Sequence, residues 1–191
     1  QGTAIFVNCP FPTLEEDAAA TNPLRIGPYC KHPYDAPSVF NISGMSFGAL
    51  SAPAVRALSR GAKMANCWMN TGEGGTSPYH LEGGCDIVAQ IGTAKYGVRA
   101  PDGGLNDDKL KELATQEQVR MFEIKLSQGA KPGKGGILPG GKVTGEIAAT
   151  RGIPEGEDSI SPNRHPEINS VADILDFIAH VREVTGKPVG F

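Results

Sequence analysis

The apolar residues of this chain fall into short extended runs that alternate with stretches of helical spacing. Residues 38–43, 66–70 and 119–126 are rich in apolar and β-branched side chains, which predicts strands. Residues 51–65 and 170–184 place apolar side chains three and four positions apart. This spacing predicts two amphipathic helices, with Ser51 and Ser170 as good N-caps.

Further segments continue this pattern. Residues 106–115 and 144–151 each begin with a capping residue and predict shorter helices. Residues 86–91 and 95–98 are two short extended pieces separated by a glycine, which predicts a hairpin. A last strand is predicted over residues 188–191.

The repeated order of strand, loop and helix is typical of parallel α/β structure. We count four or five core strands, and glycine-rich loops follow three of them. Barrels and open α/β sheets both place their active sites at such positions. A closed eight-stranded barrel takes about 250 residues, so we expect this chain of 191 residues to stop short of closure.

Residues 1–37 differ from the rest because they are rich in proline. This density excludes long regular elements, apart from a short acidic helical stretch around Leu14–Ala20. We therefore expect an N-terminal arm over residues 1–37 and a domain over residues 38–191. The chain begins with Gln1 rather than Met, which is typical of a piece of a longer protein.

Composition excludes several classes of function. The net charge is −3 with a pI near 5.8, so nothing indicates nucleic-acid binding. No apolar run approaches the length of a membrane span, and no signal peptide is visible. The four cysteines are scattered without metal-ligand spacing, so we expect no metal site, reduced thiols and a cytoplasmic protein.

Two glycine motifs resemble known catalytic loops. Gly44-Met-Ser-Phe-Gly48 fits the GxSxG elbow of serine hydrolases, which makes a Ser46 hydrolase one alternative. The elbow starts its helix directly after the serine, whereas here the N-cap Ser51 lies five residues later. Residues 136–143 nearly fit the P-loop, but Val143 replaces the hydroxyl that holds Mg²⁺. Nucleoside triphosphate binding is therefore not expected.

Acidic and basic side chains stand in the other two glycine loops. Glu73 lies between glycines in Asn70–Gly75, where the backbone can approach a ligand closely. The loop after the strand 119–126 carries Lys125, Gln128 and Lys131, together with Lys134 and Lys142. A flexible basic loop suits a dicarboxylate or phosphate, and Arg151 adds a candidate carboxylate clamp. Solvent-exposed charges with no ligand remain the alternative at these positions.

These motifs together resemble the FMN-binding domain of glutamate synthases. The resemblance is carried by 44–51 (GMSFGALS), 70–75 (NTGEGG), 124–136 (IKLSQGAKPGKGG), 138–143 (LPGGKV) and 160–162 (ISP). It implies a partial (β/α)8 TIM barrel, its N-terminal half to two thirds, preceded by the arm. It also implies that 2-iminoglutarate, made from 2-oxoglutarate and ammonia, is reduced to L-glutamate.

The resemblance assigns roles to residues of this chain. It places the FMN ring along Met45, Ser46 and Phe47, with Asn70 also at the cofactor. It makes Glu73 and Lys125 catalytic. The residues that it implies for binding the 2-oxo acid are Gln128, Lys131 and Arg151.

The resemblance also implies features that this sequence does not display. The family's FMN phosphate loops and iron–sulfur cysteines belong to a later part of the barrel, so we expect both outside this chain. The implied partner is an electron-donor protein or NAD(P)H-dependent subunit. Because a half-barrel leaves a sheet edge and an apolar face exposed, we also expect further copies of the chain as partners. Two alternatives remain beside the hydrolase: an FMN oxidoreductase acting on another amino or oxo acid, and a non-catalytic half-barrel binding module.

Overall fold

The fold is α/β, with a four-stranded parallel sheet at its centre. The computed structural model describes residues 9–19, 22–129 and 131–191. The sheet has the order β3-β4-β5-β8. Its strands are β3 (Met69–Asn70), β4 (Ile87–Ile91), β5 (Val119–Ile124) and β8 (Val189–Gly190). The expected parallel α/β structure with four or five core strands is confirmed.

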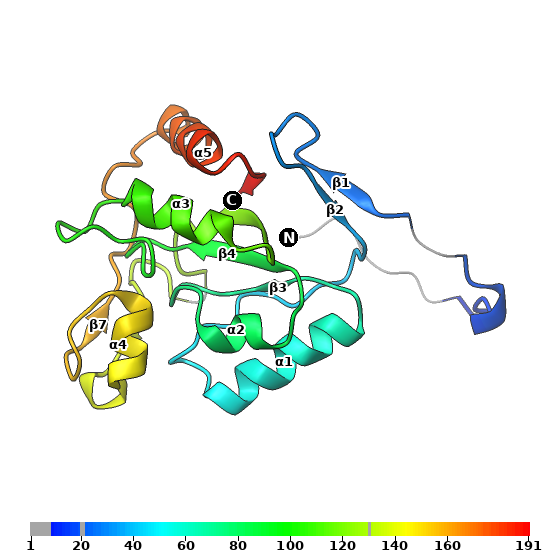
Figure 1. The fold of residues 1–191 in the computed structure, drawn as a ribbon, viewed down its shortest axis with the longest axis horizontal. Coiled ribbons are helices and arrows are strands. Elements are labelled where there is room, and N and C mark those ends of the chain that lie inside the picture. The colour runs from blue at the N-terminus through cyan, green and yellow to red at the C-terminus, as the bar shows by residue number, and fades with distance from the viewer. Residues whose placement is uncertain (1–8, 20–21, 130) are drawn as a thin grey trace.

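Helices pack against the sheet in pairs (Figure 1), α1 with α2 and α3 with α5. The helices are α1 (Ala52–Met64), α2 (Pro78–Glu82), α3 (Asp107–Thr115), α4 (Gly145–Arg151) and α5 (Val171–Thr185). Their caps follow the sequence, since the side chains of Asn106, Thr144 and Ser170 each accept a bond from a backbone N–H in the first turn. The predicted helices 51–65, 106–115, 144–151 and 170–184 are therefore confirmed within a residue or two.

The core lies between the sheet and these helices. Every residue of β4 is buried, as expected for a parallel strand covered on both faces. Ile87, Ala89 and Ile91 belong to the apolar core, with Leu110 of α3 and Val181 of α5. Because side chains alternate along a strand, the intervening residues of β4 point to the opposite face of the sheet.

Two short pairings lie outside the main sheet. The strands β1 (Leu24–Ile26) and β2 (Tyr34–Ala36) form an antiparallel hairpin in the predicted arm. The strands β6 (Ile137–Leu138) and β7 (Ser159–Ile160) also pair antiparallel, with a short 3-10 turn, Gly140–Lys142, and α4 between them. Figure 1 shows the β1–β2 hairpin on one side of the molecule and α4 with β7 on the opposite side.

The β1–β2 hairpin contacts the end of the sheet where the strands begin. The His32 N–H donates to Gly186 O at 2.8 Å, just before β8. Tyr34 is buried, and burial together with the neighbouring Asp86 carboxylate raises the pKa of its hydroxyl. The predicted acidic helix is a single 3-10 turn over Glu15–Asp17, and Ala20 lies outside the described residues, as do residues 1–8. The division into arm and domain at residue 38 stays a prediction.

Two local predictions are wrong. The hairpin predicted over residues 86–98 does not form, because β4 pairs in parallel with strands on both sides and Lys95 turns the chain at φ +54°. The strand predicted over residues 38–43 is reduced to a single bridge, Ile42 to Met69. Side chains replace the ladder there: the amide of Asn41 donates to Ser38 O, and its oxygen accepts from the Trp68 N–H.

Candidate functional site

The three predicted glycine loops lie at one edge of the sheet, where its strands end. Residues 44–50 follow the Ile42 bridge, residues 70–75 follow β3, and residues 125–142 follow β5. All of these strands run in the same direction, so their loops meet at the carboxyl-terminal edge. The site predicted from the sequence is therefore one region of the fold.

Three predicted residues form a hydrogen-bonded chain across this edge. Lys125 Nζ donates to Gln128 Oε1 at 3.0 Å, and Gln128 Nε2 donates to Glu73 Oε2 at 2.6 Å. The Ser161 hydroxyl lies 3.5 Å from the same Glu73 oxygen. Glutamine thus connects an ammonium group to a carboxylate, and all three predicted side chains are only partly buried.

Two glycines make room for the Glu73 carboxylate. A β-carbon on Gly136 would lie 2.2 Å from Glu73 Oε1, and one on Gly92 would lie 3.0 Å from Glu73 Cβ. Any larger residue at position 136 therefore has to displace the carboxylate. The glycine-rich sequence of the basic loop has a specific use here, because it lets the loop pass directly over Glu73.

A second polar group lies on the sheet face opposite the core. Glu123 Oε1 accepts from Asn70 Nδ2 at 2.9 Å and from Gln90 Nε2 at 2.8 Å. The register places Gln90 beside Glu123, on adjacent strands. Gln90 Oε1 is buried, and no described residue donates to it. Sequence reasoning missed Gln90, although a polar residue inside the apolar run 87–91 was an available signal.

The loops 44–50 and 70–75 are in close backbone contact. A β-carbon on Gly72, which has φ +67°, would lie 2.7 Å from Ser46 N, and one on Gly74 would lie 2.5 Å from Ser46 Oγ. Met45 and Ser46 are half-buried on this contact. The Phe47 side chain is in the core instead, 5% exposed, with its ring edge-on to Tyr79.

Arg151 holds this contact in place from α4. Its side chain is buried, and Nη2 donates to Ser46 Oγ at 3.3 Å and to Phe47 O at 3.4 Å. Nη1 donates to Ser159 Oγ at 3.0 Å, and burial lowers the pKa of the guanidinium. These donors bind groups of the protein, so the geometry assigns Arg151 a role in positioning the loop. Its predicted contact with a substrate carboxylate stays a prediction.

The other predicted cations lie at the surface. The side chains of Lys131, Lys134 and Lys142 are exposed. The Lys131 N–H donates to Gln128 O at 3.2 Å, which closes a turn next to the hydrogen-bonded chain. The structure therefore places Lys131 beside Gln128, with its ammonium group toward solvent.

The geometry gives no support to the Ser46 hydrolase. The Ser46 hydroxyl contacts Phe47 O and Arg151, and α1 begins at Ala52 rather than directly after the serine. Among the described residues no histidine ring is hydrogen-bonded to Ser46 Oγ, whereas a serine nucleophile needs such a base.

Three buried residues behind the site were not predicted. His80 and His165 are 0% and 1% exposed, and each ring nitrogen Nε2 contacts the carbonyl of a predicted site residue. The Lys95 ammonium is also buried, 2.9 Å from Glu167 Oε1. None of them belongs to a recognisable motif, so the sequence carries no local signal for these contacts.

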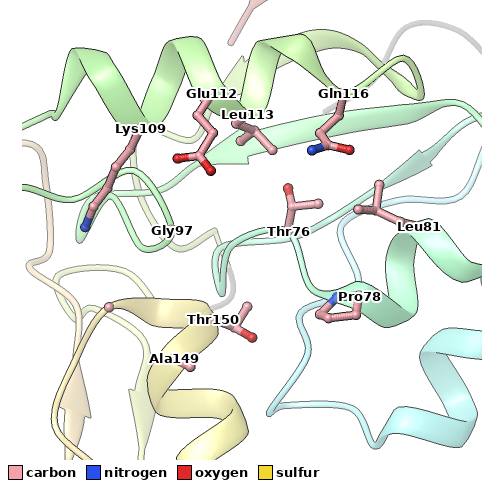
Figure 2. Close-up of a pocket in the computed structure, with 11 residues that line it drawn as sticks. Thr76, Pro78, Leu81, Gly97, Lys109, Glu112, Leu113, Gln116, Ala149 and Thr150 are labelled. Carbon is pink, nitrogen blue, oxygen red and sulfur yellow. The ribbon is translucent and has the colours of Figure 1, made fainter.

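A cavity of about 450 Å³ lies on the helical side of the sheet. Figure 2 shows it between α3, the start of α2 and the end of α4. Its lining includes Thr76, Leu81, Glu112, Leu113 and Thr150, and no predicted site residue belongs to it. The predicted site is thus an open edge rather than this cavity.

The described residues also bear on metals and membranes. No three His, Cys, Asp or Glu side chains within residues 9–19, 22–129 and 131–191 are close enough to hold a metal ion. All four cysteines are free thiols. None of the described helices combines the length and the apolar character that crossing a bilayer requires.

Comparison with known proteins identifies relatives of this chain. It is 44% identical over 162 residues to the glutamate synthase large subunit-like protein YerD of Bacillus subtilis, covering 84% of this chain and 31% of that protein. It is 38% identical over 181 residues to the archaeal-type glutamate synthase [NADPH] of Thermotoga maritima, covering 93% and 32%. The archaeal glutamate synthase [NADPH] of Methanocaldococcus jannaschii is 40% identical over 150 residues, covering 78% and 27%.

The chain spans about a third of the length of these curated relatives. A family described as "Conserved region in glutamate synthase" matches residues 15–191. That match includes all three loops of the site, and the chain belongs to the glutamate synthase family.

Proposed function

We propose that this chain is the N-terminal half to two thirds of an FMN-binding (β/α)8 barrel that reduces 2-iminoglutarate to L-glutamate. The observation that carries the proposal is the chain of hydrogen bonds from Lys125 through Gln128 to Glu73, with distances of 3.0 and 2.6 Å. It joins a cation and an anion at the carboxyl-terminal edge of a parallel sheet, where barrels bind their substrates. Family membership supports the same assignment.

The residues at this edge fit a flat cofactor with hydrogen-bonding edges. Gly44, Gly72 and Gly74 let the loops 44–50 and 70–75 pack together as one surface for the ring, because a β-carbon on each would meet an atom of the other loop within 3.3 Å. The buried Gln90 Oε1, to which no described residue donates, is an acceptor suited to a donor such as the imide N–H of a flavin. We assign Met45, Ser46 and Asn70 to this contact. When bound, FMN would supply the hydride.

The charged side chains have separate proposed roles. Lys125 uses one of its three ammonium donors on Gln128, which leaves donors for a substrate carboxylate or imine. Glu73 receives the Gln128 amide and is positioned to accept a bond from ammonia or to transfer a proton. Gln128 fixes both groups, so a negative oxo acid and a positive ammonium can be bound side by side.

Three assigned residues are proposed to act without a direct side-chain contact to the flavin or the oxo acid. Phe47 has its ring in the core, so its proposed contact with the flavin is made by its main chain. Arg151 acts on the same loop through its bonds to Ser46 and Phe47. Lys131 is exposed and is proposed to attract the dicarboxylate by charge.

The remaining proposals concern what this chain works with. We propose that FMN phosphate loops and iron–sulfur ligands are supplied from outside the described residues. Electrons would come from a donor protein or an NAD(P)H-dependent subunit, in a homo-oligomeric cytoplasmic enzyme. The names of the Thermotoga and Methanocaldococcus relatives include NADPH, which supports a nicotinamide donor.

A direct test measures flavin and product in the full-length protein that contains this chain. We expect a yellow protein with FMN bound, and glutamate formed from 2-oxoglutarate and ammonia or glutamine when an electron donor is present. Glu73→Gln should retain the flavin and lose the activity, because the substitution removes charge at nearly constant shape. A colourless protein that FMN does not stabilise would refute the proposal.

A second candidate function shares the cofactor but not the substrate. The Bacillus subtilis relative is named glutamate synthase large subunit-like, and it is more similar to this chain than the two proteins named as synthases. This favours testing an FMN oxidoreductase of another amino or oxo acid. Turnover of a panel of 2-oxo acids would separate the two functions, since only the first requires a dicarboxylate.

A further inference from the structure

Two buried histidines contact the main chain of the proposed site at corresponding places. His80 belongs to α2, and its Nε2 lies 2.7 Å from Met45 O. His165 follows β7, and its Nε2 lies 3.0 Å from Lys125 O. Met45 is the second residue of the loop 44–50, which is assigned to the flavin, and Lys125 begins the loop assigned to the oxo acid.

The partners of His80 determine which nitrogen carries its proton. Nδ1 lies 3.0 Å from the Ser77 N–H and 2.8 Å from the Ser77 hydroxyl. A backbone N–H can only donate, so Nδ1 accepts and is unprotonated. The proton is therefore on Nε2, which donates to the Met45 carbonyl. Burial lowers the pKa of this imidazole, in agreement with a neutral ring.

His165 has the same neutral Nε2–H tautomer, but other contacts determine it. A carbonyl can only accept, so the Nε2–H of His165 donates to Lys125 O. Nδ1 is buried, and no described residue forms a hydrogen bond with it. The ring packs against Phe177 with a centroid distance of 5.5 Å, and burial lowers its pKa. This ring is also a neutral donor through Nε2.

Each histidine acts where the hydrogen-bond ladder of the sheet ends. The Met45 N–H donates to Asn70 O at the end of β3, and the Lys125 N–H donates to Ile91 O at the end of β4. Beyond these bonds the chain leaves the sheet. The next carbonyl in each case is bonded by an imidazole instead of a neighbouring strand. Met45 and Lys125 are therefore each fixed through both their backbone N–H and their C=O, at the point where their loops leave the sheet.

We propose that His80 and His165 are positioning residues, with His80 fixing the flavin-side loop through Met45 and His165 fixing Lys125 at the oxo-acid side. The inference rests on the proposed function for the roles of the two loops. It adds that each imidazole fixes the main chain of the loop that binds one ligand, although neither imidazole touches that ligand. A displacement of about 1 Å at a reacting group changes rates by up to about 100-fold, so such a contact has a measurable effect.

The test uses His80→Leu and His165→Leu in the full-length protein, with Gln variants that retain an N–H donor. We expect His80→Leu to weaken FMN binding about 10-fold, measured by flavin fluorescence, with KM for the oxo acid within about 2-fold. We expect His165→Leu to raise KM or lower kcat about 10-fold, with FMN affinity unchanged. The Gln variants should recover most of each loss. His180→Leu is the matched control, since that histidine is exposed and pairs with Asp107.

Nitrogen NMR of the unmodified protein gives a readout that needs no activity. Both rings should appear as neutral Nε2–H tautomers at pH 7, and an Nδ1–H tautomer or a charged ring at either position would overturn the inference. The inference would also be overturned if both Leu variants weakened FMN binding and raised KM for the oxo acid to the same extent. If the unmodified protein shows these tautomers but does not bind FMN, the proposed function fails and the two backbone contacts stand.

Discussion

The glycines of the basic loop allow the role of Glu73 to be separated from the stability of the fold. In Gly136→Ala the new β-carbon would lie 2.2 Å from Glu73 Oε1. A comfortable carbon–oxygen contact is about 3.3 Å, so the carboxylate has to move by roughly 1 Å. The atom that moves is the end of a flexible side chain, which makes the structural cost small. The bond from Gln128 Nε2 to Glu73 Oε2, now 2.6 Å, is lost or lengthened.

Two neighbouring glycines provide matched controls. A β-carbon on Gly141 meets nothing within 4 Å, so Gly141→Ala tests the effect of a methyl group in the same loop. A β-carbon on Gly135 would lie 1.5 Å from Ser161 O, a main-chain atom next to β7 that cannot move alone. Gly135→Ala should therefore cost roughly 1–3 kcal/mol or more. For Gly136→Ala we expect a change in unfolding free energy within about 1 kcal/mol.

The assay combines urea unfolding with steady-state glutamate formation. Gly136→Ala should lower kcat/KM for the oxo acid by about 10- to 100-fold, because a catalytic group is displaced by about 1 Å. Gly141→Ala should match the unmodified protein in both measurements. If Gly136→Ala retains full kcat/KM, or if it destabilises the fold as much as Gly135→Ala does, the reasoning about Glu73 is refuted.

Three further predictions follow from the charged and titrating groups. Glu73→Gln should keep the bond to its glutamine partner but lower kcat by about 100-fold or more, measured as glutamate formation, and unchanged turnover would contradict a catalytic carboxylate. Glu167→Gln should lower the unfolding free energy by about 2 kcal/mol in urea, because the buried Lys95, 2% exposed, loses its carboxylate partner, while Glu167 itself is 40% exposed. Adding Lys95→Met should recover most of this loss, since the buried charge is then removed as well. Burial lowers the pKa values of His80 and His165 in the folded state, so protonation favours the unfolded chain. Their contribution to the unfolding free energy is therefore complete above pH 6.5 and falls as pH decreases, by up to about 1.4 kcal/mol per pH unit for each ring. A urea midpoint that is equal at pH 7 and pH 5.5 would contradict this sign.

The elements of the fold were predictable where local chemistry determines them. Helix α3 begins after Asn106 and helix α5 after Ser170 because each cap satisfies a backbone N–H that the helix itself leaves free. Gly186 ends α5 in the left-handed region, at φ +69°. These capping interactions span four or five residues, so the start and end of a helix can be predicted from the local sequence.

The failed predictions share a long-range cause. The extended piece predicted at residues 95–98 is a turn, and its Lys95 side chain is buried against Glu167, 72 residues away. In the run 38–43 the Asn41 side-chain oxygen accepts from the Trp68 N–H, 27 residues away, so a side chain bonds a donor that a strand ladder would use. No periodicity within either segment carries this information.

The candidate site was predictable in its residue types but not in its contacts. Glu73, Lys125 and Gln128 stand in glycine loops after strands, and a parallel sheet brings such loops to one edge. The burial of Arg151 and of the Phe47 ring could not be foreseen, since the first depends on how α4 packs over the loop 44–50 and the second on a ring contact with Tyr79 of α2. The same holds for Gln90, whose partner Glu123 lies 33 residues away on the next strand.

The contact of the β1–β2 hairpin with the starting end of the sheet has a consequence for protein engineering. Tyr34 and the bond from His32 to Gly186 O lie at the end of the strands opposite the glycine loops. Substitutions that raise heat tolerance can therefore be concentrated at the hairpin, and libraries that alter substrate preference can be confined to the loops 44–50, 70–75 and 125–142. Because no hydrogen bond joins the described residues of the hairpin to those of the three loops, the effects of the two sets should combine additively. A heat-stabilised variant would then serve as the starting point for selecting new substrates.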